Sequence, residues 1–198
     1  MTAVQLVEAC RALAAAGLSP GSSGNASMRS GDRILITPTG SALRRVTAGE
    51  IAVLAADGTH EEGPAPTKEW AMHLAAYRAR PDARVVVHLH SRAATAVSCL
   101  ASPGEDPLPA YTPYRVRMLG RVALVPYAAP GSDALAAGVE AAASDSHCLL
   151  LANHGSVVCA SDPGRAVDLS EELEAAAELT LALHGRDART LDPGAAWT

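Results

Sequence analysis

The sequence has 198 residues, 48% of them hydrophobic, which is enough for one domain with a sizeable core. Aromatic residues make up only 3% and phenylalanine is absent, so alanine, leucine and valine must build that core. The net charge of −5 leaves no basic surface for nucleic acid, and no uninterrupted apolar run reaches the roughly 18 residues of a membrane span. We expect a cytoplasmic protein, because the four cysteines show no pairing pattern and the N-terminus does not resemble a signal peptide.

The chain opens with a helical pattern followed by a loop of small residues. Apolar residues at helical spacing predict a helix over Ala3–Ala16. The loop Ser19–Ser27 is either an ordinary flexible turn or a nest of backbone N–H groups that binds an anion with help from Asn25. Composition alone favours the flexible turn.

Two short strands are predicted next. Arg33–Thr37 and Ile51–Leu54 are apolar runs of strand length. The first ends in a turn that carries Thr39 and Gly40, and such residues commonly end a strand. The same hydroxyl and backbone groups also offer hydrogen-bond donors, so this turn and the preceding loop could share one phosphate.

A second helix is predicted from about Lys68 to Arg80, with Thr67 as its N-cap. Glu69 falls in the first turn, where it is either a solvent-exposed carboxylate that complements the helix dipole or a catalytic carboxylate. In the second case Thr67 and Lys68 would help to hold an anion at the helix N-terminus. His73, one turn further on, is interpreted as a surface or packing residue.

The stretch Arg84–Ser91 predicts a buried strand that carries two histidines. His88 and His90 stand at positions i and i+2, so both imidazoles leave the same face, while Leu89 points into apolar packing. Rings whose backbones are about 7 Å apart can converge on one cation, because Zn–N bonds are only about 2.0–2.1 Å long. The alternative is a pair of hydrogen-bonded histidines at the end of a core strand.

Another apolar run of strand length, Cys148–Ala152, leads directly to His154. A histidine at the mouth of a buried strand, followed by Gly155 for a tight turn, is a plausible third ligand. Three protein nitrogens with an open position are the arrangement of catalytic zinc, whereas structural sites are closed by four ligands.

The remaining elements alternate between helix and strand. Glu171, Glu172, Glu174 and Glu178 of the last helix are interpreted as a solvated face, and residues 186–198 as an irregular tail. Helices interleaved with short strands favour an α/β layered domain over residues 1–198, with a central mixed or mainly antiparallel sheet flanked by helices. The further elements predicted are Ala93–Leu100 (helix), Val122–Pro126 (strand), Asp133–Ala143 (helix), Ser156–Cys159 (strand) and Ala166–Leu183 (helix).

Five short motifs, in this order, resemble the class II aldolase/adducin superfamily, which includes fuculose-1-phosphate aldolase and ribulose-5-phosphate 4-epimerase. Together they span nearly the whole chain and are far more specific than any one of them. The motifs are Ser23-Gly24-Asn25, Thr37-Pro38-Thr39-Gly40, Pro66-Thr67-Lys68-Glu69, His88-Leu89-His90 and Asn153-His154-Gly155.

The resemblance implies a class II aldolase-like fold and a set of functional residues. It implies that His88, His90 and His154 bind a divalent metal, usually zinc, and that Glu69 is the acid/base. It also implies a cyclic homotetramer in which Tyr114 reaches into the active site of a neighbouring subunit. The phosphate pocket that it implies is lined by Asn25, Thr39, Gly40, Thr67 and Lys68.

Within the superfamily, the sequence is most similar to the 3-oxo-tetronate 4-phosphate decarboxylases. Ala128 and Ala129 stand where that subgroup tends to have a tyrosine and an arginine, and Ser156 stands where it has a proline. These departures leave the substrate open. The similarity rests on Thr67-Lys68-Glu69, Thr112-Pro113-Tyr114, Leu124-Val125-Pro126-Tyr127, Leu150–Gly155 and Glu171-Glu172-Leu173-Glu174.

Three hypotheses for the function follow. The first is a metal-dependent lyase that decarboxylates a 3-oxo-tetronate 4-phosphate through a metal-bound enediolate, with Glu69 returning a proton to carbon. The second is aldol cleavage of a ketose 1-phosphate to dihydroxyacetone phosphate and an aldehyde, which passes through the same enediolate. The third is a non-catalytic, adducin-like structural protein. Because all three histidines and Glu69 are present, catalysis is favoured by roughly ten to one.

Overall fold

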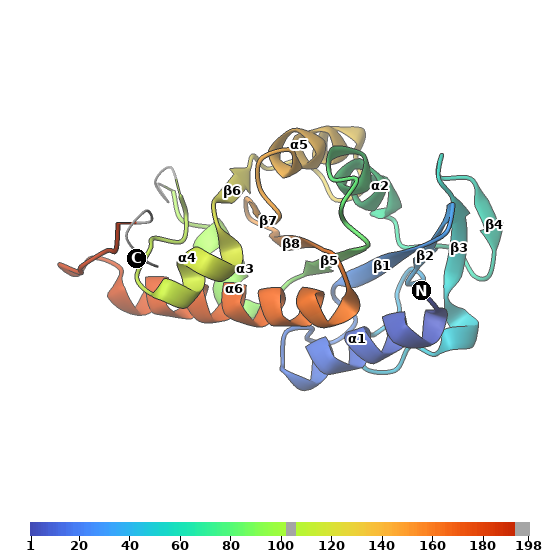
Figure 1. Ribbon diagram of the computed structural model, residues 1–198, viewed down its shortest axis with the longest axis horizontal. Helices are drawn as coiled ribbons and strands as arrows, with labels where there is room; N and C mark the ends of the chain where they lie inside the picture. The colour runs from blue at the N-terminus through green and yellow to red at the C-terminus, as the bar shows by residue number, and fades with distance from the viewer. Residues whose placement is uncertain (102–105, 193–198) are drawn as a thin grey trace.

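Eight strands form one mixed sheet through the middle of the protein (Figure 1). The computed structural model describes residues 1–101 and 106–192. Along the sheet the strands lie in the order β4-β3-β2-β1-β5-β8-β7-β6, and every neighbouring pair is antiparallel except β6 and β7. The strands are β1 (Asn25–Ser30), β2 (Arg33–Ile36), β3 (Ala52–Ala55), β4 (His60–Glu62), β5 (Val85–Leu89), β6 (Val122–Val125), β7 (Cys148–Leu151) and β8 (Gly155–Ala160).

Helices cover both faces of the sheet, so the predicted α/β layered fold is confirmed (Figure 1). One face packs against α1 (Ala3–Ala15), α3 (Arg92–Ser98) and α6 (Pro163–Leu183), with α4 (Pro113–Leu119) beside α6. The other face packs against α2 (Trp70–Ala79) and α5 (Asp133–Ala143). A short 3-10 helix, η1, spans Ala48–Glu50. In the described part of the chain, no helix has the length and apolar character needed to cross a bilayer.

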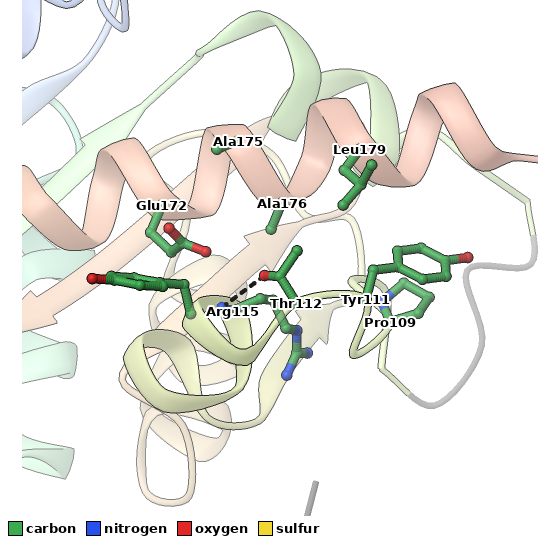
Figure 2. A pocket seen from close by; sticks show the side chains of 9 residues that line it. Pro109, Tyr111, Thr112, Arg115, Glu172, Ala175, Ala176 and Leu179 are labelled. Carbon is green, nitrogen blue, oxygen red and sulfur yellow. Dashed lines mark hydrogen bonds between the residues drawn. The ribbon is translucent and has the colours of Figure 1, made fainter. Parts of the chain in front are cut away.

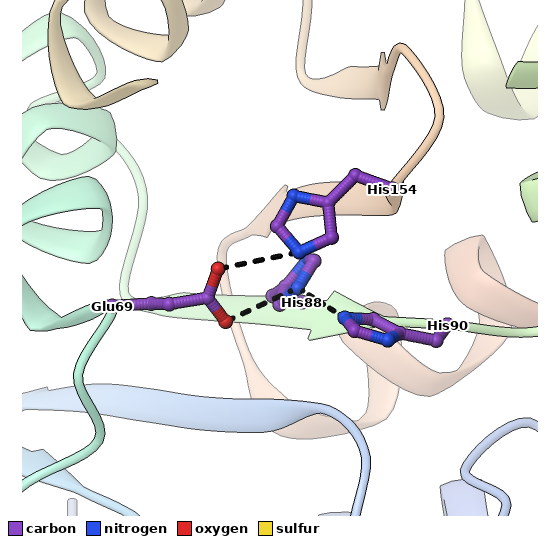
Figure 3. Close-up of side chains that lie close together, drawn as sticks. All are labelled: Glu69, His88, His90 and His154. Carbon is purple, nitrogen blue, oxygen red and sulfur yellow. Dashed lines mark hydrogen bonds and ion pairs between the residues drawn. The ribbon is translucent and has the colours of Figure 1, made fainter. Parts of the chain in front are cut away.

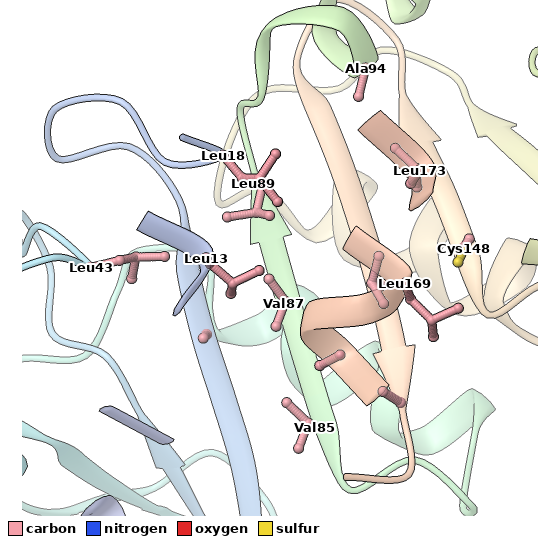
Figure 4. Packing of buried hydrophobic residues seen from close by; sticks show 14 of the residues in the cluster. Leu13, Leu18, Leu43, Val85, Val87, Leu89, Ala94, Cys148, Leu169 and Leu173 are labelled. Atoms are coloured by element: carbon pink, nitrogen blue, oxygen red, sulfur yellow. The ribbon is translucent and has the colours of Figure 1, made fainter. Parts of the chain in front are cut away.

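Strand β5 divides the core into two halves because its side chains alternate between the faces of the sheet. Val85, Val87 and Leu89 pack with residues of α1 and α6, as Figure 4 shows. Val86 belongs to the opposite cluster under α2 and α5. His88 therefore leaves the strand on the α2 side, and Leu89 points into apolar packing as predicted.

Strand β1 is a correction to the prediction of a loop over Ser19–Ser27. Its residues are mostly polar, but Ala26 and Met28 are fully buried on the α1 side of the sheet. The polar Asn25 and Ser27 face α2, and they are buried as well. Polar and apolar residues do alternate from Asn25 to Arg29, but Asn25, Ala26 and Ser27 were assigned to the loop of small residues before them, so this period of two was missed.

Two further elements were not predicted, and one helix start was placed wrongly. The edge strand β4 is exposed at all three residues, and α4 lies between the predicted elements Ala93–Leu100 and Val122–Pro126. Helix α2 begins at Trp70, with Glu69 rather than Thr67 at the N-cap position. Residues 186–192 contain no helix or strand, and the rest of the predicted tail, 193–198, lies outside the described residues.

Candidate metal and anion site

Two histidines converge at the C-terminal end of β5. His88 is fully buried on the strand, and His90 follows directly after it. Their Nε2 atoms are 2.8 Å apart, and their ring centroids are 4.7 Å apart. The i and i+2 spacing therefore brings the rings together as predicted.

His154 reaches the same point from the turn that joins β7 to β8. Asn153 has a φ of 54°, a left-handed conformation that asparagine tolerates better than most residues. Gly155 is needed for another reason than the one predicted: its φ is not positive, but an added Cβ would collide with the backbone carbonyl of Leu89 on β5. The ring of His154 lies 4.8 Å from that of His88 and 4.9 Å from that of His90.

Glu69 completes the cluster from the start of α2, as Figure 3 shows. Its Oε2 is 3.3 Å from Nε2 of His88, and its Oε1 is 3.4 Å from Nε2 of His154. One ligand atom from each of the four side chains lies within 4.8 Å of all the others. Bonds of about 2.0–2.2 Å to a central ion place nitrogen and oxygen ligands at this kind of spacing. The four groups thus fit a divalent cation.

The protonation states also suit a metal. Nδ1 of His88 donates to the backbone carbonyl of Ser156 at 2.9 Å, so Nε2 carries the lone pair that faces the cluster. Burial, followed by the neighbouring imidazoles of His90 and His154, holds the pKa of His88 well below its ordinary value. Burial and then His154 also lower the pKa of His90. Neutral imidazole is the form that binds metal ions.

A polar cavity of about 230 Å³ adjoins the cluster. Glu69 and His90 belong to its lining, so the cavity and the cluster share two residues. Close packing shapes the wall: Gly24 has a φ of +81°, and an added Cβ would stand 2.9 Å from the carbonyl oxygen of His88. All five residues of the predicted phosphate pocket line this cavity, namely Asn25, Thr39, Gly40, Thr67 and Lys68.

Tyr114 is the one predicted site residue that the structure brings neither to the cluster nor to the adjoining cavity within this chain. Its side chain lies on α4 and is 63% exposed. It lines a different cavity of about 340 Å³, between α4 and α6, whose lining also includes Tyr111 and Glu172 (Figure 2). That Tyr114 serves the site of a neighbouring subunit stays a prediction.

The structure decides between the two interpretations of His73 and corrects that of Glu174. His73 is fully buried and hydrogen-bonded to Asn25 and Ser27, so it is a packing residue and not a surface residue. Glu174 is not part of a solvated face, because its carboxylate accepts hydrogen bonds from Ser91 Oγ at 2.6 Å and from the backbone N–H groups of Ala93 and Ala94 at 2.8 and 3.0 Å. It thus holds the start of α3, directly after His90. Glu69, His73 and Tyr77 stand at four-residue intervals and so share one helix face. This spacing was the one signal in the sequence for the contacts of His73.

Comparison with known proteins gives an independent view of the same chain. Residues 4–181 match the family model described as Class II Aldolase and Adducin N-terminal domain. The chain is 42% identical over 180 residues to the 3-oxo-tetronate 4-phosphate decarboxylase of Escherichia coli K12, covering 90% of this chain and 85% of that protein. It is 38% identical over 179 residues to an L-fuculose phosphate aldolase of Escherichia coli O6:H1, covering 89% and 81%. The crystal structure of YgbL from Escherichia coli superposes with a TM-score of 0.92 at 38% identity, covering 97% of this chain and 94% of that one.

Proposed function

Because the chain belongs to the class II aldolase and adducin family, we propose that it is a metal-dependent carbon–carbon lyase that decarboxylates a 3-oxo-tetronate 4-phosphate. The family membership inferred from the five motifs is confirmed, and the two named relatives, a decarboxylase and an aldolase, are both lyases. The reaction, the substrate, the metal and the roles of individual residues are our proposal.

The observation that carries the proposal is that the cluster of four candidate metal ligands and the polar cavity share two residues. Glu69 and His90 belong to both. Lys68 and the hydroxyl of Thr67 lie in the same cavity wall, and both can donate hydrogen bonds to a phosphate. A short phosphorylated sugar acid would place its phosphate among these donors and its reacting carbons beside the histidines. The arrangement thus matches the two ends of such a substrate.

A divalent cation, for which we propose zinc, would be held by His88, His90 and His154, and would supply a Lewis acid that stabilises negative charge on a keto oxygen. The bond from the carboxyl carbon to C2 breaks, carbon dioxide leaves, and the electron pair stays on the remaining fragment as an enediolate. Glu69, protonated at that moment, gives its proton to C2, which yields dihydroxyacetone phosphate and leaves Glu69 as the ionised carboxylate. Among the described residues its buried Oε1 has no hydrogen-bond partner, so this oxygen is available for the proton.

Aldol cleavage of a ketose 1-phosphate is the second candidate function. The identity to the L-fuculose phosphate aldolase, 38%, is close to the 42% found for the decarboxylase. Retro-aldol cleavage would leave the same enediolate on the protein and would use the same acid/base, since only the departing fragment differs. The third hypothesis, a non-catalytic adducin-like protein, is disfavoured because four candidate ligands converge in a buried cluster.

A product assay tests the proposal. Zinc-loaded protein is offered 3-oxo-tetronate 4-phosphate and, separately, ketose 1-phosphates, while carbon dioxide and aldehyde are both measured. We expect carbon dioxide and dihydroxyacetone phosphate from the first substrate. Aldehyde release from a ketose 1-phosphate, with no carbon dioxide from 3-oxo-tetronate 4-phosphate, would refute the decarboxylase proposal and support the aldolase. Inactivity on both, with metal bound, would indicate that Ala128 and Ala129 mark a different substrate.

A further inference from the structure

A buried row of polar side chains leads from the body of the protein to Glu69. Glu69, His73 and Tyr77 stand at four-residue intervals at the start of α2 and along it, and so share one face. Asn25 and Ser27 stand two residues apart on β1 and face this helix. All five side chains are buried, although each of them carries a polar group.

Hydrogen bonds join these five residues into one chain. Asn25 Nδ2 donates to Glu69 Oε2 at 2.9 Å, and Asn25 Oδ1 lies 2.5 Å from His73 Nε2. On the other side of the ring, His73 Nδ1 lies 2.7 Å from the hydroxyl of Ser27, which in turn lies 3.0 Å from the hydroxyl of Tyr77. Each end of the His73 ring therefore has one partner.

An ionised carboxylate at Glu69 fixes the direction of the three hydrogen bonds that lead from it to Ser27. An ionised Glu69 can only accept, so Asn25 must present its nitrogen to it and its oxygen to His73. The oxygen can only accept, so His73 must carry its proton on Nε2. Nδ1 is then an acceptor, which makes Ser27 the donor to the ring. Burial lowers the pKa of His73 to about 3, so the ring is neutral and has one proton to place.

We propose that His73 is a positioning residue that sets the orientation of Asn25 and, through it, of the Glu69 carboxylate. Without the N–H of His73, the amide oxygen of Asn25 loses its partner, and only the bond to Glu69 still holds the amide. The amide could then turn about its side-chain torsion angles, and the carboxylate that it holds would turn with it. With His73 in place, Oε2 is held by Asn25 and Oε1 faces the histidine cluster.

The catalytic consequence rests on the proposed role of Glu69 as the acid/base. Proton transfer from a carboxylic acid to a carbon atom requires one orientation of the two groups, so the rate of transfer falls when the carboxyl group can turn away from it. Loss of a group that orients a functional side chain through a hydrogen bond commonly lowers activity or metal affinity about 10–100-fold. We therefore expect His73 to affect kcat rather than the binding of phosphate or metal.

Two substitutions of similar size separate positioning from simple packing. In His73→Gln the longer amide can still place an N–H donor near the position of Nε2, whereas in His73→Asn the shorter amide reaches only the position of Nδ1. We expect kcat to fall about 10–100-fold in His73→Asn and to stay within a few-fold in His73→Gln. Inhibition by inorganic phosphate and zinc content should be unchanged in both. An equal loss of kcat in the two variants would overturn the proposal.

A double-mutant cycle checks that the effect passes through Asn25. If His73 acts on Glu69 by way of Asn25, His73→Asn should cost little more once Asn25→Ala is present. Full additivity of the two losses would contradict the inference. The same cycle read as thermal stability remains informative if neither candidate reaction is catalysed.

The closing experiment is made on the folded wild-type protein and does not depend on any enzymatic activity. Nitrogen-15 NMR of the wild-type protein with labelled histidine distinguishes the two neutral tautomers, and His73→Gln identifies the resonance. We expect His73 to be locked as the Nε2–H tautomer from neutral pH down to about pH 5. An Nδ1–H tautomer, or fast exchange between the two, would overturn the proposal whatever the protein turns over.

Discussion

The histidine cluster (Glu69, His88, His90 and His154) and the polar cavity that adjoins it are neighbours, but they are built in opposite ways. The residues of the cluster lie at strand ends, and buried hydrogen bonds hold their side chains. His88 donates to the backbone carbonyl of Ser156, and Glu69 accepts from the side chain of Asn25. The cavity is walled by three loops of small residues, and its one cationic side chain, Lys68, is exposed. The cluster thus depends on the packing of the whole sheet, whereas the cavity depends on local backbone shape.

This difference predicts how each region responds to substitution. A charge or ligand removed from a buried, water-poor site has no solvent to replace it, so the loss is large. A charge removed from an exposed wall is partly replaced by water and by neighbouring donors, so the loss is small. Five experiments test this contrast, beginning with the largest expected effect.

Loss of a buried ligand should be the most damaging change. His88→Ala removes a fully buried imidazole from the centre of the cluster, and we expect loss of bound metal and a fall in turnover beyond that of any other variant below. Metal analysis of the purified protein measures the first effect. The control is His184→Ala, which removes an exposed histidine at the end of α6. Full metal content in His88→Ala would refute the assignment of this ligand.

Glu69→Gln should come second. The substitution preserves shape but removes the group that can carry a proton, so turnover should fall by about 10²–10⁴-fold. Zinc content should be largely kept, because the three histidines remain. Steady-state kinetics measures the loss, with Glu178→Gln, an exposed position on α6, as the matched control. If Glu69→Gln turned over as fast as the control, Glu69 would have no acid/base role.

Glu174→Gln tests whether support from behind the cluster matters. Its carboxylate accepts three hydrogen bonds at the start of α3, and an amide can satisfy only part of them. We expect a loss of about 1–3 kcal/mol in the free energy of unfolding and a roughly tenfold loss of zinc affinity, since α3 follows His90 directly. Thermal denaturation and zinc titration measure these effects. Unchanged values for both would show that Glu174 is dispensable.

Lys68→Ala should have a smaller effect, on the cavity alone. Because Lys68 is exposed, its loss should raise the inhibition constant of inorganic phosphate and the KM about three- to tenfold, with kcat and metal content kept. Arg11→Ala, which removes an exposed cation of α1, is the control for net charge. A loss of metal in Lys68→Ala would mean that the two regions are not independent.

The same contrast explains which parts of the molecule could be predicted from the sequence. The valine run of β5 has a period that places His88 and His90 on one face, so both the strand and the convergence of the two rings could be read from spacing. The role of His73 could not, because the four-residue spacing of Glu69, His73 and Tyr77 places them on one helix face but does not show that this face is buried or what it contacts. The burial of the polar residues of β1 could not be predicted either, because it depends on their long-range contacts with α2.

Glu174 shows a second limit. Four glutamates in one helix indicate a charged, solvated face, and only the position of α3 turns one of them inward. Tyr114 shows a third limit, since its predicted role in a neighbouring subunit cannot be tested by the contacts of one chain. Local pattern predicted the strands that carry the histidines, and tertiary contact decided which polar side chains support them.

The smallest effect at neutral pH should come from the protonation of His73, and it separates the two regions by their response to acid. Burial lowers its pKa in the folded protein to about 3, whereas in the unfolded chain it should titrate near its ordinary value of 6.5. Between these values the unfolded chain binds a proton that the folded protein does not, so His73 costs stability as the pH falls from about 6.5 toward 3. His73→Gln cannot take up this proton.

Denaturant unfolding of metal-free protein between pH 4 and 6 should therefore show a smaller slope of the free energy of unfolding against pH in His73→Gln. The difference should correspond to about one proton fewer taken up on unfolding. Lys68→Ala should keep the wild-type slope, because it leaves the buried ring of His73 in place. Equal slopes in wild type and His73→Gln would mean that the buried ring is protonated as readily as an exposed one, and the contrast between the cluster and the cavity would fail at that residue.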